Sequence, residues 1–318
     1  MLSAVVALVG AVVYGSADFL GGLAARRLRS IVVTAVAAAS GLVALAIAQP
    51  LLGGLWTLPD VMWGMLAGIA GVLAVALLYA CLAIGPMSIL SPLTALVSAI
   101  APMLWGLLVK ADSLAPIGYG GLAVALVAVV LVGFLPGANI VRPTARGLLM
   151  ATGSGLAIGA FLILIDQTSS ESGLVPLVTS RATSALVTVA FVGVMAAAAV
   201  RRGAPARSVL QVSGPPLGAT PTGHADLEHA TSAEVGLAAP ARRAWWLAIA
   251  CGIADASANA LMLFALRSGD LSVVSALTAL YPAGTILLAA IVLRERVAPV
   301  QWIGLALALT AGGMLAVA

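Results

Sequence analysis

Charge is scarce in this sequence of 318 residues. Only 8% of the residues are Asp, Glu, Lys or Arg and 5% are aromatic, whereas 62% are hydrophobic and the mean hydropathy is +1.17. A soluble domain carries charge on about a quarter of its residues, because charged side chains cover its surface. The scarcity of charge therefore excludes a soluble protein and predicts an integral membrane protein.

Groups that carry enzyme chemistry are also missing. "TGSG" at 152–155 resembles the Gly-Ser-Gly of rhomboid-type proteases, but no apolar run contains a histidine to act as base. "YGSAD" at 14–18 supplies one aspartate, whereas an aspartyl protease needs a pair. The sequence has neither an acidic cluster for magnesium diphosphate nor a P-loop. We expect no enzymatic activity, cofactor or metal.

The two cysteines and two histidines are weak candidates for a site. Cys81 and Cys251 each lie inside an apolar run, which favours small core residues over a disulfide or metal pair. His224 and His229 lack acidic or cysteine ligands at a fixed spacing, so a metal or pH site there is not favoured. The net charge of +4 comes from basic residues at the ends of apolar runs, which indicates membrane anchoring rather than nucleic-acid binding.

Ten apolar runs are long enough to cross ~30 Å of hydrocarbon. They are continuous rather than alternating, which excludes β-barrel strands, and the first lacks the basic start of a signal peptide. We expect an all-α membrane protein with ten transmembrane helices at 2–24, 31–52, 61–84, 87–109, 117–135, 147–167, 174–200, 244–266, 271–293 and 299–317.

One long polar segment, residues 201–243, separates the seventh run from the eighth. It is rich in Pro, Gly, Ala, Ser and Thr and has no helical period, so it predicts a flexible linker. Of the 15 basic residues, 12 lie in this linker and in the other odd-numbered loops, against Lys110 and Arg267 in even-numbered loops. The positive-inside rule therefore predicts a cytoplasmic linker and both termini outside.

The sequence contains an internal repeat. Residues 68–110 align without a gap on 252–294, and 16 of the 43 positions are identical, where composition alone gives roughly five. Five spans is an odd number, so the second half enters the membrane from the opposite side. We expect two inverted five-helix repeats, 1–135 and 147–317, joined by 136–146, with the linker inside the second. Inverted repeats are typical of secondary transporters, whose substrate sites lie between the halves.

Hydroxyl side chains recur on one face of the fourth and ninth runs. They are Ser88, Ser91, Thr94 and Ser98 in the fourth, and Ser272, Ser275, Thr278, Tyr281 and Thr285 in the ninth. Pro92, Pro102 and Pro282 interrupt the same runs and free backbone carbonyls, which need water or neighbours inside a membrane. Close helix packing and the lining of a cavity both explain this pattern, and the prolines favour the cavity.

Four charged residues lie within the spans, where a lone charge costs at least a few kcal/mol. Asp255 lies midway along the eighth run with Asn259 one turn away, and Asp18 lies in the first run with Tyr14 one turn away. Asp255 and Asp18 are candidates for a proton site or a contact to a substrate amine; the alternative for each is a structural hydrogen bond.

Asp166 and Arg181 form a second set, at the end of the sixth run and early in the seventh. They are candidates for an ion pair at the rim. Alternatively, Arg181 binds a substrate carboxylate, for which its planar guanidinium is suited. "GMLAG" at 64–68 and "GLAIG" at 155–159 match GxxxG and indicate tight helix packing.

These motifs resemble the EamA family of the drug/metabolite transporter superfamily. The resemblance rests on "YGSADFLGGLAARR" (14–27), "LVPLVTSR" (174–181), the hydroxyl-bearing fourth span and "LRERVAPVQWIGLALALTAGGMLA" (293–316) with Glu295. The first half carries Asp112 in the charged turn, and the linker is longer than usual for the family. The resemblance implies a ten-helix carrier with a central cavity that exports small metabolites or amino acids by alternating access, often with protons. It also implies cytoplasmic termini, opposite to the arginine count.

We therefore expect a bacterial inner-membrane exporter whose third, fourth, eighth and ninth spans line the cavity. Its expected partners are a small-molecule substrate, protons and the lipid bilayer, and a homodimer stays open. The alternatives are an uncoupled facilitator and a non-transporting subunit, such as a flippase partner or a scaffold. The expected pathway residues are Tyr14, Asp18, Ser91, Thr94, Ser98, Asp255, Asn259, Ser275, Thr278 and Tyr281.

Overall fold

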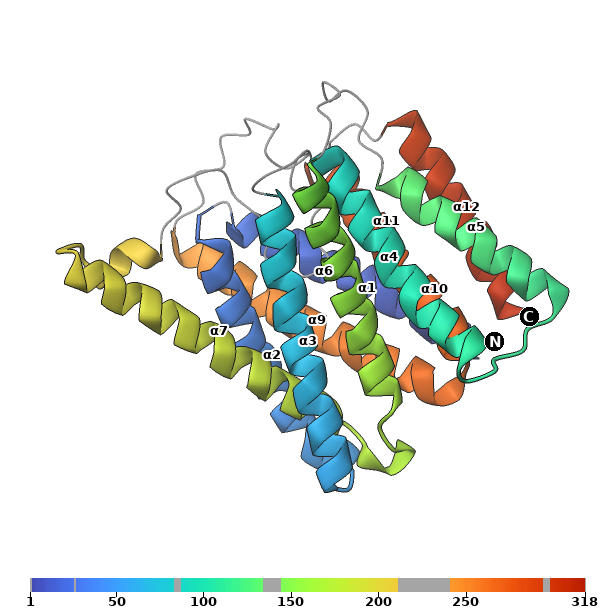
Figure 1. Ribbon diagram of the computed structural model, residues 1–318, viewed down its shortest axis with the longest axis horizontal. Coiled ribbons are helices and arrows are strands. Elements are labelled where there is room, and N and C mark those ends of the chain that lie inside the picture. Colours follow the sequence, from blue (N-terminus) through green and yellow to red (C-terminus); the bar gives the residue numbers. More distant parts are fainter. Residues whose placement is uncertain are drawn as a thin grey trace.

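The computed structural model describes residues 2–25, 27–82, 87–133, 144–210, 241–293 and 298–317. Within these residues the regular elements are helices (Figure 1). They are α1 Leu2–Ala25, α2 Ser30–Leu52, α3 Leu58–Leu82, α4 Met87–Leu108, α5 Pro116–Val132, α6 Ala145–Asp166, η1 Ser170–Ser172, α7 Val175–Arg201, η2 Ala206–Val209, α9 Ala241–Ser268, α10 Leu271–Thr278, α11 Tyr281–Leu288, the π-helical η3 Ala289–Leu293 and α12 Pro299–Ala316.

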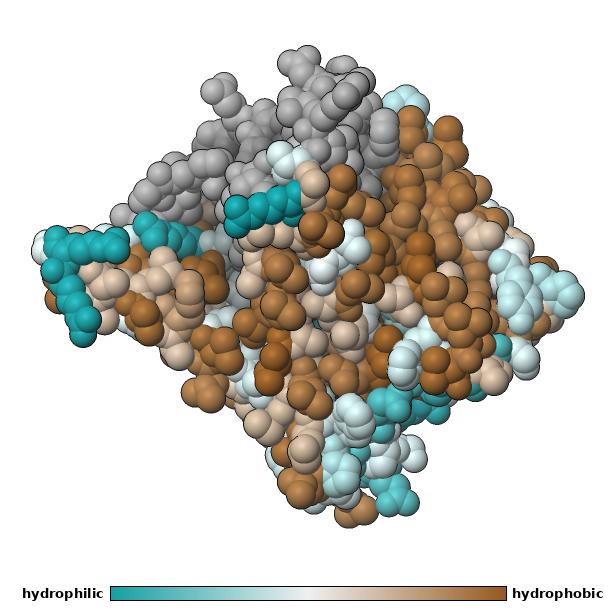
Figure 2. Space-filling view, in the orientation of Figure 1, coloured by the Kyte–Doolittle hydropathy of each residue, from teal (hydrophilic) through white to brown (hydrophobic). Residues whose placement is uncertain are grey.

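The expected ten-span fold is confirmed. Eight stretches are long and apolar enough to span a membrane, and α4 and α5 each supply a shorter apolar helix. Each described helix end falls within a few residues of its expected boundary. Apolar side chains such as Leu51, Leu149 and Leu186 are exposed on the outside of the bundle. Figure 2 shows hydrophobic residues over much of the coloured face in view, and a bilayer would cover such a surface.

The ninth span differs from its expected form because it is not one continuous helix. α10 ends at Thr278, a turn occupies Ala279 and Leu280, and α11 begins at Tyr281. Pro282 has no N–H to donate to Thr278, four residues earlier, so the helical ladder is interrupted here. In contrast, α4 runs unbroken through Pro92 and Pro102, so the expected interruption of the fourth span is wrong.

The most extensive helix contacts each have a counterpart in which the helices of one half are replaced by those of the other half. The contact of α1 with α9 corresponds to that of α6 with α3, the contact of α1 with α11 to that of α6 with α4, and the contact of α2 with α9 to that of α7 with α3. α2 packs on α7, α4 on α10 and α5 on α12, and each of these pairs is its own counterpart. An inverted repeat produces this pattern, because a pseudo-two-fold axis turns each contact into another. The residue boundaries of the two repeats stay a prediction.

The two sequence halves are not two spatial units. Unit A comprises α1, α2, α9, α10 and α11, and unit B comprises α3, α4, α6 and α7, as the packing pairs define them. Each unit takes helices from both repeats, while α5 and α12 lie side by side at the edge of the bundle (Figure 1). The chain therefore crosses between the units several times, and the space between them is bordered by both repeats.

Glycines permit the closest helix contacts. A Cβ on Gly15 of α1 would lie 2.6 Å from the carbonyl oxygen of Tyr281 and from the amide nitrogen of Thr285, so only glycine fits against α11. Gly64 and Gly68 lie against α7, and Gly155 and Gly159 against α4. The packing role expected for both GxxxG motifs is confirmed. Cys81 and Cys251 are both buried, as expected for small core residues.

The basic residues gather at one end of the bundle, which we call the arginine-rich end. Among the described residues it holds Arg27, Arg29, Arg146, Arg201, Arg202, Arg207, Arg242 and Arg243, at the ends of α1, α6, α7 and α9. We call the other end, where both chain termini lie in Figure 1, the Lys110 end. Exposed Trp246 and Trp302 lie near the first end and Trp56 and Trp105 near the second, as in an interfacial aromatic belt.

The expected linker begins in ordered structure rather than in a flexible segment. η2 spans Ala206–Val209, the Val209 side chain is buried, and the amide of Arg29 donates to the Leu210 carbonyl at 3.2 Å. The remainder, 211–240, lies outside the described residues and includes His224 and His229. The charged turn with Glu295 and the loop 134–143 also lie outside them.

Candidate functional site

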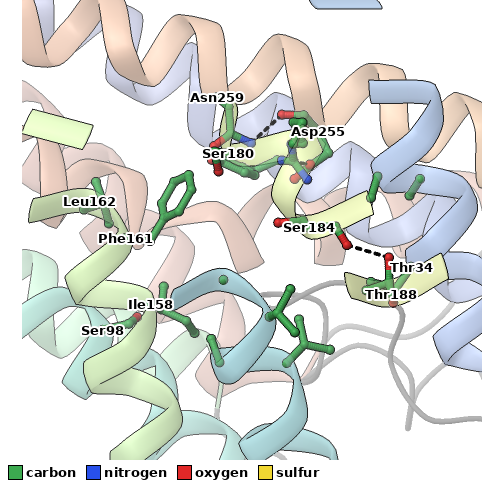
Figure 3. Close-up of a pocket in the computed structure, with 18 of the residues that line it drawn as sticks. Thr34, Ser98, Ile158, Phe161, Leu162, Ser180, Ser184, Thr188, Asp255 and Asn259 are labelled. Carbon is green, nitrogen blue, oxygen red and sulfur yellow. Dashed lines mark hydrogen bonds and ion pairs between the residues drawn. The ribbon is translucent and has the colours of Figure 1, made fainter. Parts of the chain in front are cut away.

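A cavity of about 420 Å³ lies between units A and B. Its wall comes from α1, α2, α3, α4, α6, α7, α9, α10 and α11, so the expected lining by the third, fourth, eighth and ninth spans is incomplete. Figure 3 shows Asp255, Asn259 and Ser180 on one side and Ile158, Phe161 and Leu162 of α6 on another. The charged and amide groups thus lie on one wall, whereas α6 supplies an apolar wall with Ser98 beside it.

An ion pair between Arg181 and Asp255 crosses the polar wall. Arg181 comes from α7 in unit B and Asp255 from the middle of α9 in unit A, and their side chains are 19% and 9% exposed. Each charge thereby has the partner that it needs in a low-dielectric site. Because the pair joins the two units, a change in either charge would alter the interaction between them.

Two neighbours complete this part of the wall. The Asn259 side-chain amide donates to the Asp255 backbone carbonyl at 2.8 Å. The Tyr14 hydroxyl lies 3.9 Å from the Met262 sulfur. Among the described atoms, Asn259 Oδ1 and Thr278 Oγ1 are buried without a hydrogen-bond partner, although both residues line the cavity. An unpartnered buried acceptor costs free energy that a bound solute or water would recover.

The expected ion pair between Asp166 and Arg181 is wrong. Asp166 instead pairs with Lys110, whose ammonium lies 2.8 Å from Oδ2, at the end of the bundle where α4 and α6 finish. Arg181 lies in the cavity two turns inside α7, at the depth of Asp255. Asp166 and Arg181 are close in sequence, but Arg181 lies on the face of α7 that points towards α9.

The hydroxyl residues serve two purposes. Ser98, Ser275, Thr278 and Tyr281 line the cavity. Thr94 donates to the Ala151 carbonyl of α6 at 3.1 Å, and Thr285 donates to the Gly15 carbonyl of α1 at 3.1 Å, so these two hold neighbouring helices together. The side chains of Ser88 and Ser91 lie outside the described residues. Some hydroxyl residues of the repeated motif therefore line the cavity, and others stabilise the packing of neighbouring helices.

Asp18 is buried in α1 and is not among the cavity residues, whereas Tyr14, one turn earlier, is. Sequence reasoning missed the hydroxyls of α7, Ser180, Ser184 and Thr188, which also line the cavity. Their four-residue spacing on the same helix face as Arg181 is the signal that would have found them. The apolar wall of α6 carried no such signal, because its residues resemble any other membrane span.

The cavity extends unequally towards the two ends. It reaches Ile31, in the first turn of α2 at the arginine-rich end. Towards the Lys110 end its last lining residues, Leu162 of α6 and Ser275 of α10, lie four residues from the helix ends, which is about one helical turn. Along α2 the cavity therefore approaches the arginine-rich end more closely than it approaches the Lys110 end.

Polar contacts close the Lys110 end across the two units. Arg267 of α9 donates to the Ser169 carbonyl at 3.1 Å and to the Ser172 hydroxyl at 2.9 Å. Asp112, after α4, accepts a hydrogen bond from the Ser272 amide of α10 at 3.1 Å. Partial burial raises the pKa of the nearby Asp270 carboxyl, Asp112 raises it further, and Lys110 opposes both.

Comparison with known proteins agrees with this geometry. The model of the EamA-like transporter family matches residues 235–316, which include α9 to α12. This segment is similar to a domain of the EamA-like transporter family. The family forms part of the drug/metabolite transporter superfamily and is not an enzyme family. The expected resemblance is thereby confirmed for this segment, and with it the expectation of a multi-pass membrane protein.

The likeness in fold extends over the whole chain. A protein known from a crystal structure matches with a TM-score of 0.71 at 15% sequence identity, covering 99% of this chain and 96% of its own. At that identity the likeness shows the fold alone. No curated protein matches the sequence. The EamA-like segment supplies α9, α10 and α11 of unit A together with α12, and its counterparts in the inverted repeat are α3, α4 and α5.

Proposed function

We propose that the chain is a proton-coupled secondary transporter that exports small organic metabolites or amino acids by alternating access. Membership of residues 235–316 in a transporter family supports the transport of a small molecule. The observation that carries the finer proposal is the Arg181–Asp255 ion pair, because it joins units A and B inside the cavity.

In this mechanism Asp255 is the proton-sensitive group. With Asp255 ionised, Arg181 holds the two units together at mid-depth, and solute enters the cavity from the arginine-rich end. Solute bound beside Arg181 and Asp255 weakens the ion pair, so the units separate there and the contacts of Arg267 and Asp112 at the Lys110 end are released. Asp255 then takes up a proton from outside as the solute leaves, and it releases this proton to the cytoplasm after the cavity has opened to the arginine-rich end again. Inward proton movement would thus drive outward solute movement.

We place the protein in a bacterial inner membrane, with the arginine-rich end and the linker in the cytoplasm and both termini outside. The support is the unequal distribution of arginine between the two ends. Alkaline phosphatase, which is active only outside the cytoplasm, should be active when fused after Ala318 and inactive when inserted at Thr220. The reverse result would invert the orientation.

Flux across an imposed pH gradient tests the coupling. Proteoliposomes are loaded with a defined mixture of amino acids and nucleosides, and mass spectrometry follows the efflux of each. We expect external acid to accelerate the efflux of at least one solute several-fold over protein-free liposomes. Asp255→Asn should abolish the acceleration, whereas Asp166→Asn, which removes a carboxylate outside the cavity, should keep it.

Other outcomes contradict the proposal in distinguishable ways. Acceleration that persists in Asp255→Asn would remove the proton role from this residue. Efflux that is equally fast without a gradient would identify an uncoupled facilitator. A chain that moves no solute while staying folded, as judged by size-exclusion chromatography and melting temperature, would favour a non-transporting subunit such as a flippase partner or a scaffold.

A further inference from the structure

The internal repeat gives each cavity residue of α9 a counterpart on α3. In the gapless alignment of 68–110 with 252–294, Asp255 corresponds to Gly71 and Asn259 to Val75. All four residues line the cavity. The same turns of the two related helices thus present a carboxylate and an amide on one side, and a glycine and a valine on the other.

The partner helices follow the same correspondence. A Cβ on Gly252 of α9 would collide with the Ala37 carbonyl of α2, and a Cβ on Gly68 of α3 would lie 2.5 Å from the Ser180 carbonyl of α7. Since Gly252 and Gly68 are counterparts, so are Ala37 and Ser180, and the next residues along are Ala38 and Arg181. The Arg181–Asp255 pair therefore corresponds to Ala38 and Gly71, which both line the cavity.

The position that corresponds to the ion pair in the inverted repeat has free space. Arg181 and Asp255 bridge α7 and α9 with two long side chains. Ala38 and Gly71 have short side chains or none, and over their described residues α2 and α3 are not among the helices that pack together. A Cβ built on Gly71 meets no heavy atom within 4 Å. The wall is therefore recessed at Gly71, and Val72, Val75 and Ala37 border the recess.

The charges of the polar wall restrict the polar part of a ligand. Arg181 and Asp255 are the charged residues that line the cavity within the described chain, and together they are neutral. A cation or an anion alone would leave one of them uncompensated, which is costly away from water. A head group without net charge can use both of them, with Asn259 Oδ1 and Thr278 Oγ1 as further acceptors.

We propose that the cavity binds an amphiphile of zero net charge, with its polar head at Arg181–Asp255 and its apolar body in the recess at Gly71, and that Gly71 sets the size of the body. This rests on the proposed function, because it names the class of solute that the same cavity carries. Burial of an apolar body against Val72, Val75 and Phe161 supplies the affinity, while the ion pair selects the head.

Binding of a homologous series tests the recess without requiring transport. The probes are straight-chain 2-amino acids from alanine to 2-aminooctanoic acid, with n-alkylamines and n-alkanoates of equal chain length as singly charged controls. Binding to the protein in nanodiscs is measured as ligand-dependent stabilisation against heat. We expect affinity for the zwitterions to rise about fourfold for each added methylene until the recess is full, since each buried methylene contributes a constant free energy.

Gly71→Leu fills the recess and should abolish the rise with chain length while the shortest zwitterion still binds. Gly313→Leu is the matched control, because Gly313 is also a helical glycine whose Cβ would meet nothing within 4 Å, but it lies on α12 outside the cavity. This variant should keep the wild-type slope, and it also corrects for partitioning of the probes into lipid.

Three results would overturn the inference. They are a flat dependence on chain length in the wild type, an unchanged slope in Gly71→Leu, and stronger binding of amines or alkanoates than of zwitterions. Because binding is measured directly, an intact slope together with absent proton-driven flux would refute the proposed coupling and leave the recess in place. Flux with an unchanged slope in Gly71→Leu would refute the recess alone.

Discussion

Arg181 and Asp255 are the residues on which the function depends, and their coupling can be measured. Removing one partner leaves the other charge buried and uncompensated, which destabilises a folded protein by roughly 3–5 kcal/mol. We expect Arg181→Gln and Asp255→Asn each to destabilise the folded protein strongly, and the double variant to lose less than the sum of the two. Denaturation of all four proteins in the same detergent gives the coupling free energy.

The Lys110–Asp166 pair provides the control for this cycle. The Lys110 side chain is 39% exposed and the Asp166 side chain 3%, so only one of the two groups is well solvated. Exposed pairs couple by roughly 0.2–1 kcal/mol, and a half-exposed pair should couple less strongly than a pair that is buried on both sides. The effects of Lys110→Gln and Asp166→Asn should therefore be closer to additive than those of the cavity variants. Equal coupling in the two cycles would mean that the cavity pair is as well solvated as the rim pair, which would contradict its role between the units.

Among the individual residues, sequence reasoning identified part of the site. Asp255, Asn259 and Tyr14 were expected from one rule, that polar groups inside a span need a partner or water, and all three line the cavity. The same rule selected Asp18, which is buried elsewhere. The rule predicts that a polar side chain is buried, but it does not predict whether its face of the helix borders the cavity. The packing of the helices determines which faces border the cavity.

At the scale of the elements, span positions were predictable because the thickness of the hydrocarbon fixes the length of each apolar run. The break between α10 and α11 was only half predictable. Pro282 marks the place, since it lacks a backbone donor. The Ala279 amide still donates to the Ser275 carbonyl four residues earlier, whereas the Leu280 amide donates to the Leu277 carbonyl only three residues earlier. Pro92 and Pro102 gave the same signal, yet α4 is continuous.

The two related helices therefore differ where they border the cavity. Ser98 of α4 occupies the repeat position of Pro282, and Val97 that of Tyr281. Ser98 and Tyr281 both line the cavity, but only the second lies beside a turn. A broken helix can bend at its turn at lower cost than an intact one, so unit A is the unit that we expect to deform during exchange between states.

At the scale of the whole molecule, the inverted repeat was predictable from 43 aligned residues because an odd number of spans forces the inversion. The composition of units A and B was not, since each takes helices from both halves. The pairing of Arg181 with Asp255, and the recess opposite it, follow from that exchange. The sequence repeat shows which residues correspond, whereas only the fold shows which residues are in contact.

Thiol labelling detects whether the cavity between units A and B is filled with water and opens to the arginine-rich end. Cysteines are placed singly at Ser98 and Thr278, which line the cavity, and at Thr94, which is buried in packing, in a background with Cys81 and Cys251 replaced by alanine. A membrane-impermeant maleimide is applied to everted vesicles and, separately, to spheroplasts. We predict rapid modification of the first two cysteines in everted vesicles and none of the third. Failure to modify either cavity position from either side would contradict a water-filled cavity.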